Sequence, residues 1–250
     1  MTEKIKLAGI TDSSSIDYPG KISAVVYLCG CPFRCPWCQN PELVLEEGYR
    51  LAEIDEIINE LKNNFLIDAV CITGGEPLAQ KETIELLRRI KSETKLLLKI
   101  DHNCFFPDML EKALPYLDHL TTDIKAPLDE RYGKVTGLPG SWEKIVANVK
   151  KSHEILACWP GKKEARTTVV PGLIDKDDEI REIAKVVHGV GFDSYVIQQF
   201  RPDKTLEERF ERVKSPSVER MRELGKIAKK ELPDTDVRIV TTDGGFETVG

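Results

Sequence analysis

The chain has 250 residues and a net charge of −6 at pH 7. Hydrophobic residues make up 41% and charged residues 31% of it, which excludes disordered and collagen-like classes and indicates an ordinary globular protein. Basic residues are interleaved with acidic ones. This argues against nucleic-acid binding, because neutralising phosphates requires a basic surface.

Targeting signals and cysteine usage suggest a compartment. No apolar run approaches the ~18 residues of a membrane span, and residues 1–7 lack the apolar core of a signal peptide. Seven cysteines, an odd number, favour metal ligands or free thiols over a disulfide framework. We therefore expect a cytoplasmic protein that does not contact a membrane.

Beyond residue 20, short β-like runs alternate with longer amphipathic stretches, the pattern typical of parallel strands with helical crossovers. Strands are predicted over 22–29, 69–73, 95–100, 119–124, 165–170 and 194–199. Helices are predicted over 51–61, 83–90, 107–114, 142–156, 178–187 and 217–230. We expect a single α/β domain, a partial (β/α)6 TIM-like barrel with parallel strands over 21–232, between an N-terminal segment 1–20 and a C-terminal tail 233–250.

Polar or glycine-rich motifs follow five of these strands. In barrel-like α/β folds the carboxyl ends of the strands hold the active site, so these motifs are expected on one rim. They comprise a cysteine loop after the first strand and residues 73–77, 101–103, 123–125 and 171–172 after the next four.

The cysteine loop carries Cys31, Cys35 and Cys38 in a C-x3-C-x2-C pattern. Iron–sulfur clusters and structural zinc usually take four protein ligands, so three thiolates on one loop leave a coordination position for another group. The alternatives are buried thiols, or a zinc site completed by Cys29, Cys71 or a histidine. The paired C-x2-C units typical of zinc sites are absent.

The cysteine spacing, with Trp37 before the last cysteine, and the run Thr-Gly-Gly-Glu-Pro at 73–77 resemble the signatures of radical S-adenosylmethionine enzymes. Within that group, residues 17–20, 30–43 and 123–127 and the pattern Arg166-x3-Val-Pro-Gly resemble glycyl-radical-enzyme activases. They are most similar to the activating proteins of anaerobic ribonucleotide reductase, with pyruvate formate-lyase activating enzymes as near relatives. The resemblance runs from about residue 17 to residue 201.

The resemblance implies cofactors and partners. Cys31, Cys35 and Cys38 would bind three irons of a [4Fe–4S] cluster, whose fourth iron takes S-adenosylmethionine. Reductive cleavage of S-adenosylmethionine would give a 5'-deoxyadenosyl radical that removes hydrogen from a glycine of a partner enzyme. An external flavodoxin or ferredoxin is expected to supply the electron.

The same resemblance implies roles around the cofactor. Trp37 would lie by the adenine. Gly74 and Gly75 would let the backbone approach the methionine, Glu76 would pair with its ammonium group, and Pro77 would end the strand exit.

Charged residues at later strand ends complete the implied site. Lys125 and Arg166 would lie near the cofactor carboxylate or ribose, or would hold the loops that cover the cofactor. Asp101 and Asp123 match aspartates that line a monovalent-cation site. The family pattern Asp-Thr-Asn-Gly reads Asp-His-Asn-Cys at 101–104 here, so a hydroxyl ligand and a glycine are missing. The alternative for all four charges is an ion pair without a chemical role.

Two other functions stay open. The chain could be a radical S-adenosylmethionine enzyme acting on a small molecule, of the deazapurine-forming type. It could also be a non-catalytic iron–sulfur or zinc-binding module that carries electrons or holds a loop, which would leave the motif at 74–77 without a task.

Overall fold

The computed structural model describes residues 3–250. The chain divides into two compact units. Unit 1 contains the described residues up to Pro32 together with Asn40–Thr121, and unit 2 contains Phe33–Gln39 and Thr122–Gly250. The boundary therefore falls within the cysteine loop and again within a strand.

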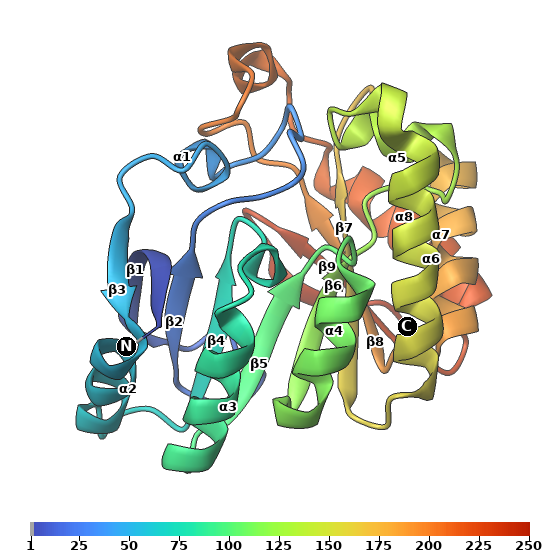
Figure 1. The fold of residues 1–250 in the computed structure, drawn as a ribbon. Helices are drawn as coiled ribbons and strands as arrows, with labels where there is room; N and C mark the ends of the chain where they lie inside the picture. The colour runs from blue at the N-terminus through green and yellow to red at the C-terminus, as the bar shows by residue number, and fades with distance from the viewer. Residues whose placement is uncertain (1–2) are drawn as a thin grey trace. The chain divides into compact units, whose positions relative to one another are not determined.

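Unit 1 consists of five strands with short helices. The strands are β1 Lys4–Ser14, β2 Ser23–Leu28, β3 Arg50–Glu53, β4 Ala69–Gly74 and β5 Leu97–His102. The helices are α1 Pro41–Val44, α2 Ile54–Asn63, α3 Thr83–Glu93 and α4 Pro107–Ala113. The strand order is β5-β4-β2-β1-β3 (Figure 1). Strands β2, β4 and β5 are parallel, and β1 is antiparallel to both of its neighbours.

Apolar patterning explains these elements. Residues 69–72 of β4 are all buried, as expected for a parallel strand covered on both faces. Helix α2 buries Ile54, Ile57, Ile58 and Leu61, a three- and four-residue spacing that gives the helix one apolar face.

Unit 2 continues the α/β pattern. Its strands are β6 His119–Asp123, which begins in unit 1, β7 Lys162–Val169, β8 Ser194–Gln199, β9 Asp236–Thr241 and β10 Gly245–Thr248. Its helices are α5 Glu130–Val135, α6 Trp142–Cys158, α7 Asp177–Val190 and α8 Val218–Glu231. The order is β10-β9-β8-β7-β6, with β7, β8 and β9 parallel and β10 antiparallel to β9.

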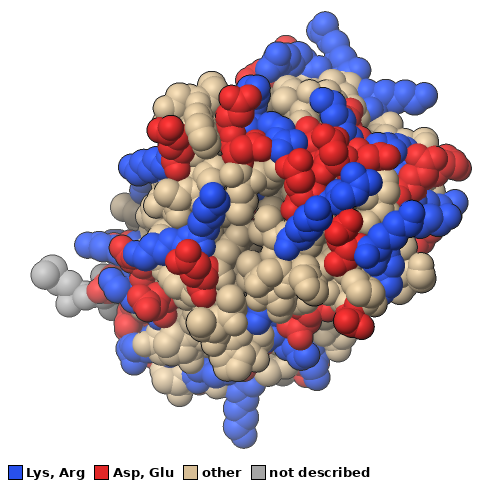
Figure 2. All heavy atoms as spheres, turned by 90° about the vertical axis from the view of Figure 1, so that its right-hand side faces the viewer, with Lys and Arg blue, Asp and Glu red and all other residues tan. Residues whose placement is uncertain are grey.

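The surface helices of unit 2 carry mixed charge. Figure 2 shows acidic and basic side chains interspersed over the face that includes α6 and α7, matching their interleaving in the sequence. Along the described residues, no helix combines the length and apolar character needed to cross a bilayer.

The predicted parallel α/β architecture is confirmed, and all six predicted strands are present as β2 and β4 to β8. The structure adds β1, β3 and β10, and it places β9 parallel to β8. The tail 233–250 therefore supplies strands of unit 2. The predicted motifs do follow strand ends: residues 75–77 and 103 in unit 1, and residues 125 and 171–172 in unit 2.

Helix α7 ends at a residue whose backbone favours glycine. Gly191 has φ +73° and ψ +49°, and its N–H is bonded to the Val187 and His188 carbonyls, both at 3.1 Å. A Cβ atom there would meet nothing within 4 Å, so any cost of a side chain lies in the backbone alone.

We expect Gly191→Ala to lower the free energy of unfolding by about 1 kcal/mol, measured by urea denaturation. The control is Gly140→Ala, where φ is not positive and the space is equally open. Equal losses in the two variants would contradict the backbone explanation.

Candidate functional site

The three cysteines lie on the irregular loop of residues 29–40, between β2 and α1. In unit 1, the loop is held by a hydrogen bond from the Glu76 N–H to the Gly30 carbonyl, 2.8 Å. Asn103, just after β5, directs its amide group at the Cys31 sulfur, with Nδ2 3.8 Å from Sγ. Cys31 thus has a hydrogen-bond donor at its sulfur.

Cys35 and Cys38, in unit 2, belong to a tight turn in which the Cys38 N–H donates to the Cys35 carbonyl, 3.0 Å. Cys35 is buried and Cys38 is half-buried. Burial raises the pKa of Cys35 to about 12, because little water is near to solvate a thiolate. The free thiol is therefore protonated, and bonding to a metal would be needed to hold it as a thiolate.

A segment of unit 2 spanning residues 201–213, which we call the strap, is bonded to this turn. The Leu206 N–H donates to the Cys38 carbonyl, 3.0 Å, and the Glu207 N–H donates to the Pro36 carbonyl, 2.9 Å. Both bonds join main chain to main chain. No residue pattern predicts them, since almost any side chain could occupy these positions.

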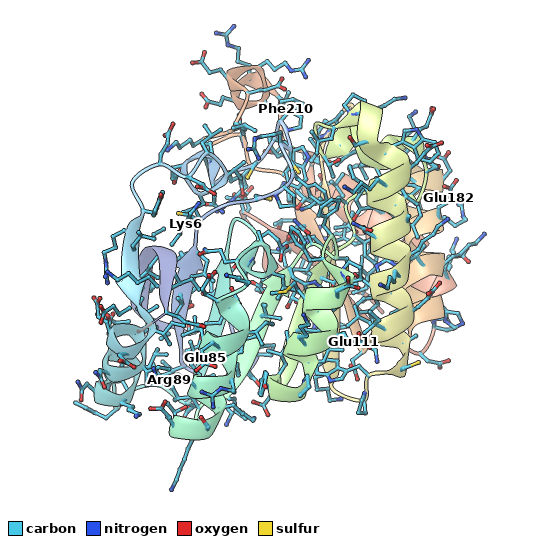
Figure 3. The ribbon with its side chains drawn as sticks, in the orientation of Figure 1. Lys6, Glu85, Arg89, Glu111, Glu182 and Phe210 are labelled. Atoms are coloured by element: carbon cyan, nitrogen blue, oxygen red, sulfur yellow. The ribbon has the colours of Figure 1, made fainter. Side chains whose placement is uncertain are left out.

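Trp37 is anchored between the strap and the rest of unit 2. Phe210 of the strap (Figure 3) forms a buried apolar cluster with Val170 and Phe200, and Trp37 packs against it. The indole N–H donates to a main-chain carbonyl of α5, 3.2 Å, and the Lys125 ammonium lies 5.2 Å from the ring centroid. The placement of Trp37 beside an adenine stays a prediction.

Gly74 and Gly75 allow two strand ends to approach closely. Gly74 has φ +130°, and a Cβ atom on it would lie 2.1 Å from the Leu28 carbonyl oxygen. A Cβ atom on Gly75 would lie 2.3 Å from the Gly30 carbonyl oxygen. Both glycines are therefore required by backbone packing against β2 and the start of the cysteine loop, whatever they do for a cofactor.

Glu76 connects the ends of β4 and β5. Its side chain is 1% exposed, and its two oxygens accept from the Leu78 N–H (2.9 Å) and the Asn103 N–H (2.7 Å). The first bond caps the short helix η1, Pro77–Ala79, so Pro77 begins this turn at the strand exit. The contact of Glu76 with the methionine ammonium stays a prediction.

The turn at 101–104 departs from the family pattern in residues, and its last residue has a backbone conformation that favours glycine. Cys104 has φ +63°, the left-handed region that favours the glycine expected there, at a cost of about 1 kcal/mol. Its N–H donates to His102 Nδ1, 3.3 Å. The Asp101 carboxylate accepts from the ammonium group of Lys99, two residues earlier on β5.

The predicted cations of unit 2 each hold an acidic partner. Lys125 donates to Asp123, Nζ to Oδ2 2.8 Å, and Arg166 donates to Glu164, Nε to Oε1 2.7 Å. Burial works to lower the pKa of Lys125, but the Asp123 carboxylate outweighs it and the pKa is raised above its usual value. Ion pairing is thus established for all four predicted charges, and contact with a cofactor stays a prediction.

The other cysteines do not suggest a zinc site. Cys29, Cys71 and Cys104 are buried, Cys158 is exposed, and none of the four forms a disulfide. Among residues 3–250, no three side chains of His, Cys, Asp or Glu converge as the ligands of one metal ion would.

Comparison with known proteins identifies the family. The model of the Radical SAM superfamily matches residues 25–187. The chain belongs to the radical SAM superfamily. It is 36% identical over 246 residues, 98% of this chain and 99% of the other, to a Methanocaldococcus jannaschii protein provisionally named a glycyl-radical enzyme activating enzyme.

More distant relatives include an activating enzyme, and a solved structure that matches is a radical SAM enzyme. A pyruvate formate-lyase-activating enzyme of Clostridium pasteurianum is 26% identical over 74% of this chain and 77% of its own. A 7-carboxy-7-deazaguanine synthase of Aquifex aeolicus is 40% identical, but over only 30% of this chain and 33% of its own. The solved structure of a radical SAM methyltransferase from Sphaerobacter thermophilus aligns with TM-score 0.65 at 15% identity, over 89% of this chain and 67% of the other, so the fold is shared.

Membership of the glycyl-radical enzyme activating family settles the cofactors at family level. Radical SAM enzymes use a [4Fe–4S] cluster and S-adenosylmethionine, which confirms the cofactor prediction. The residues present fit such a cluster: three cysteines outside any disulfide on one loop, backbone packing that fixes the start of the loop, and an amide donor at the Cys31 sulfur.

Three structural features beside the site were not predicted from the sequence: Lys99, Asn103 and the strap. Lys99 could have been noticed as a charge inside the otherwise apolar strand 97–100, two positions before an aspartate. Asn103 could not, because its position relative to Cys31 depends on the turn at 101–104. The strap depends on main-chain bonds and leaves no residue signature.

Glu76 provides a test that needs no cofactor. Glu76→Ala leaves two buried N–H groups without their acceptor and should lower the free energy of unfolding by about 3 kcal/mol, with Glu76→Gln losing about half as much. Urea denaturation measures both. Glu111→Ala on the exposed side of α4 (Figure 3) is the control, expected to change stability by less than ~0.5 kcal/mol. A Glu76→Ala protein as stable as the control would show that Glu76 does not stabilise the connection between the ends of β4 and β5.

Proposed function

We propose that the protein activates an anaerobic ribonucleotide reductase by installing a glycyl radical on it. The observation that supports this proposal is the cysteine loop, whose start at Gly30 and Cys31 packs against Gly75, in a chain similar along its length to an activating enzyme. The activating family is established above; the identity of the reductase as the target is the proposal.

The three cysteines would hold the cluster. When bound and reduced, the cluster supplies the electron that cleaves S-adenosylmethionine to methionine and a 5'-deoxyadenosyl radical, which takes a hydrogen atom from the partner's glycine. The chain's own contribution is to fix and shield the site. The N–H of Asn103 is fixed by Glu76, and Asn103 directs its amide at Cys31, so the loop is positioned before any cofactor arrives.

Several side chains are proposed to hold S-adenosylmethionine. Glu76 would accept from the methionine ammonium, and Trp37 would border the adenine. Lys125, already at the Trp37 ring, and Arg166 would offer positive charge to the carboxylate or ribose. Their present ion pairs with acidic neighbours keep these charges fixed in place.

The electron is proposed to come from an external flavodoxin or ferredoxin. Besides Cys31, Cys35 and Cys38, the four remaining cysteines are scattered at positions 29, 71, 104 and 158 and share no tight ligand spacing. A second cluster within this sequence therefore has no ligand motif.

A small-molecule radical enzyme is the second candidate. Its support is the deazaguanine synthase, whose similarity covers 30% of the chain. The activating enzyme of M. jannaschii is matched over 98%. The wider match favours activation of a partner protein.

The cluster assignment is tested by anaerobic reconstitution. Cys35→Ala should lose the [4Fe–4S] absorption and form at least 100-fold less 5'-deoxyadenosine, because two thiolates cannot replace three as ligands. Cys158→Ala, at an exposed thiol, should retain both. A Cys35→Ala protein that keeps the cluster or the cleavage removes the ligand assignment, and a wild-type protein that carries the cluster but forms no 5'-deoxyadenosine contradicts the function.

The identity of the activated partner is tested by mixing this protein with the candidate reductase. We expect an electron paramagnetic resonance doublet when the reduced protein and S-adenosylmethionine are added to the glycyl-radical subunit of an anaerobic ribonucleotide reductase. A reductase with alanine in place of the radical glycine is the control. A doublet on pyruvate formate-lyase but not on the reductase would move the assignment to that partner.

A further inference from the structure

Lys99 is a charged side chain enclosed within unit 1. It is 0% exposed, although lysine is almost never fully buried unless paired. Its ammonium group donates to Asp101 Oδ1 and contacts the Cys71 sulfur, Nζ to Sγ 3.5 Å. Lys99 and Asp101 lie two positions apart on β5 and so on one face, and Cys71 is the register partner of Lys99 on β4.

Stability alone does not account for Lys99. Desolvating a buried ion pair often costs as much as the pairing returns, and apolar residues of similar volume are commonly as stable or more so. The residue instead delivers a fixed positive charge to the carboxylate of Asp101. That carboxylate is 22% exposed at the carboxyl end of β5, beside the turn that contacts Cys31.

The structure does not fit the monovalent-cation site that the resemblance implies. In unit 1, Asp101 is paired with Lys99, and in unit 2, Asp123 is paired with Lys125 at 2.8 Å. An alkali ion at either carboxylate would be repelled by an ammonium group already in contact with it. His102 stands where a hydroxyl ligand is expected, and its Nδ1 accepts a main-chain N–H of the same turn, 3.3 Å.

We propose that Lys99 is a built-in cation: its ammonium group supplies at Asp101 the positive charge that a bound alkali ion would otherwise supply, so cofactor binding needs no monovalent cation. Lys99 is thus a positioning residue that acts through Asp101. The claim that S-adenosylmethionine binds without an alkali ion rests on the proposed function. The claim that Lys99 supplies the positive charge at Asp101 does not.

The test compares thermal unfolding in K⁺, Na⁺ and tetramethylammonium chloride at equal ionic strength, without cluster or S-adenosylmethionine. Wild-type protein should unfold at the same temperature in all three salts. Lys99→Met should lower the unfolding temperature by ~5 °C or more in tetramethylammonium, a cation too large to reach the carboxylate, and K⁺ or Na⁺ should restore part of the loss. Lys91→Met, which removes the exposed Lys91–Asp118 pair, is the control and should show no such rescue.

A wild-type unfolding temperature that rises selectively with K⁺ or Na⁺ overturns the proposal, and so does a Lys99→Met protein that no alkali ion rescues. If Lys99→Met does not fold, the double variant Lys99→Met/Asp101→Asn decides. Removing both charges should recover a folded protein that is indifferent to the salt. Failure of the double variant to fold would show that Lys99 serves packing and not Asp101.

The cofactor part is measured as equilibrium binding of S-adenosylmethionine to the reconstituted protein in the same three salts. Wild-type affinity should vary by less than ~2-fold, and Lys99→Met should bind ~5-fold or more tightly in K⁺ or Na⁺ than in tetramethylammonium. Wild-type binding that requires an alkali ion contradicts the proposal. Absence of any binding contradicts the proposed function instead, and the unfolding comparison still decides the role of Lys99.

Discussion

The close backbone contact between the ends of β2 and β4 is the constraint on which the rest of unit 1 depends. It brings Gly74 against Leu28 and Gly75 against Gly30, at separations that exclude a Cβ atom. Residue 31 follows directly, so the first cysteine leaves the sheet from a fixed backbone position. Glu76 then extends the same arrangement to β5 through Asn103, whose amide reaches the Cys31 sulfur. Backbone packing thus positions the loop ahead of any metal chemistry.

Three charged pairs at strand ends are formed by neighbours on the same strand or just beyond it. Lys99 and Asp101, Glu164 and Arg166, and Asp123 and Lys125 are all separated by two residues. That separation places two side chains of a strand on one face, so the pairs form with little ordering of distant chain. Fixed dipoles and charges need no reorganisation when a reaction develops charge, which is a principal way for a protein to assist chemistry.

The sequence predicted structure correctly where side-chain chemistry or the spacing of apolar residues determines it. Six strands and the cysteine motif were predictable because apolar runs and ligand spacing are local properties. Three of the remaining strands have weak patterns: β1 buries only two of its 11 residues, and β3 and β10 have only four residues each. The structural roles of Gly74 and Glu76 were missed because both depend on partners distant in sequence, Leu28 and Asn103.

The strap joins the cysteine loop through main-chain atoms at Leu206 and Glu207, and any residue except proline can donate such a bond. Side chains along its outer surface are therefore unconstrained by the task of holding the loop. A position such as Glu208, which is exposed, can change identity while the turn of Cys35 and Cys38 keeps its shape. The strap, although bonded to this turn, is thus a segment in which sequence can differ between relatives that serve different partners.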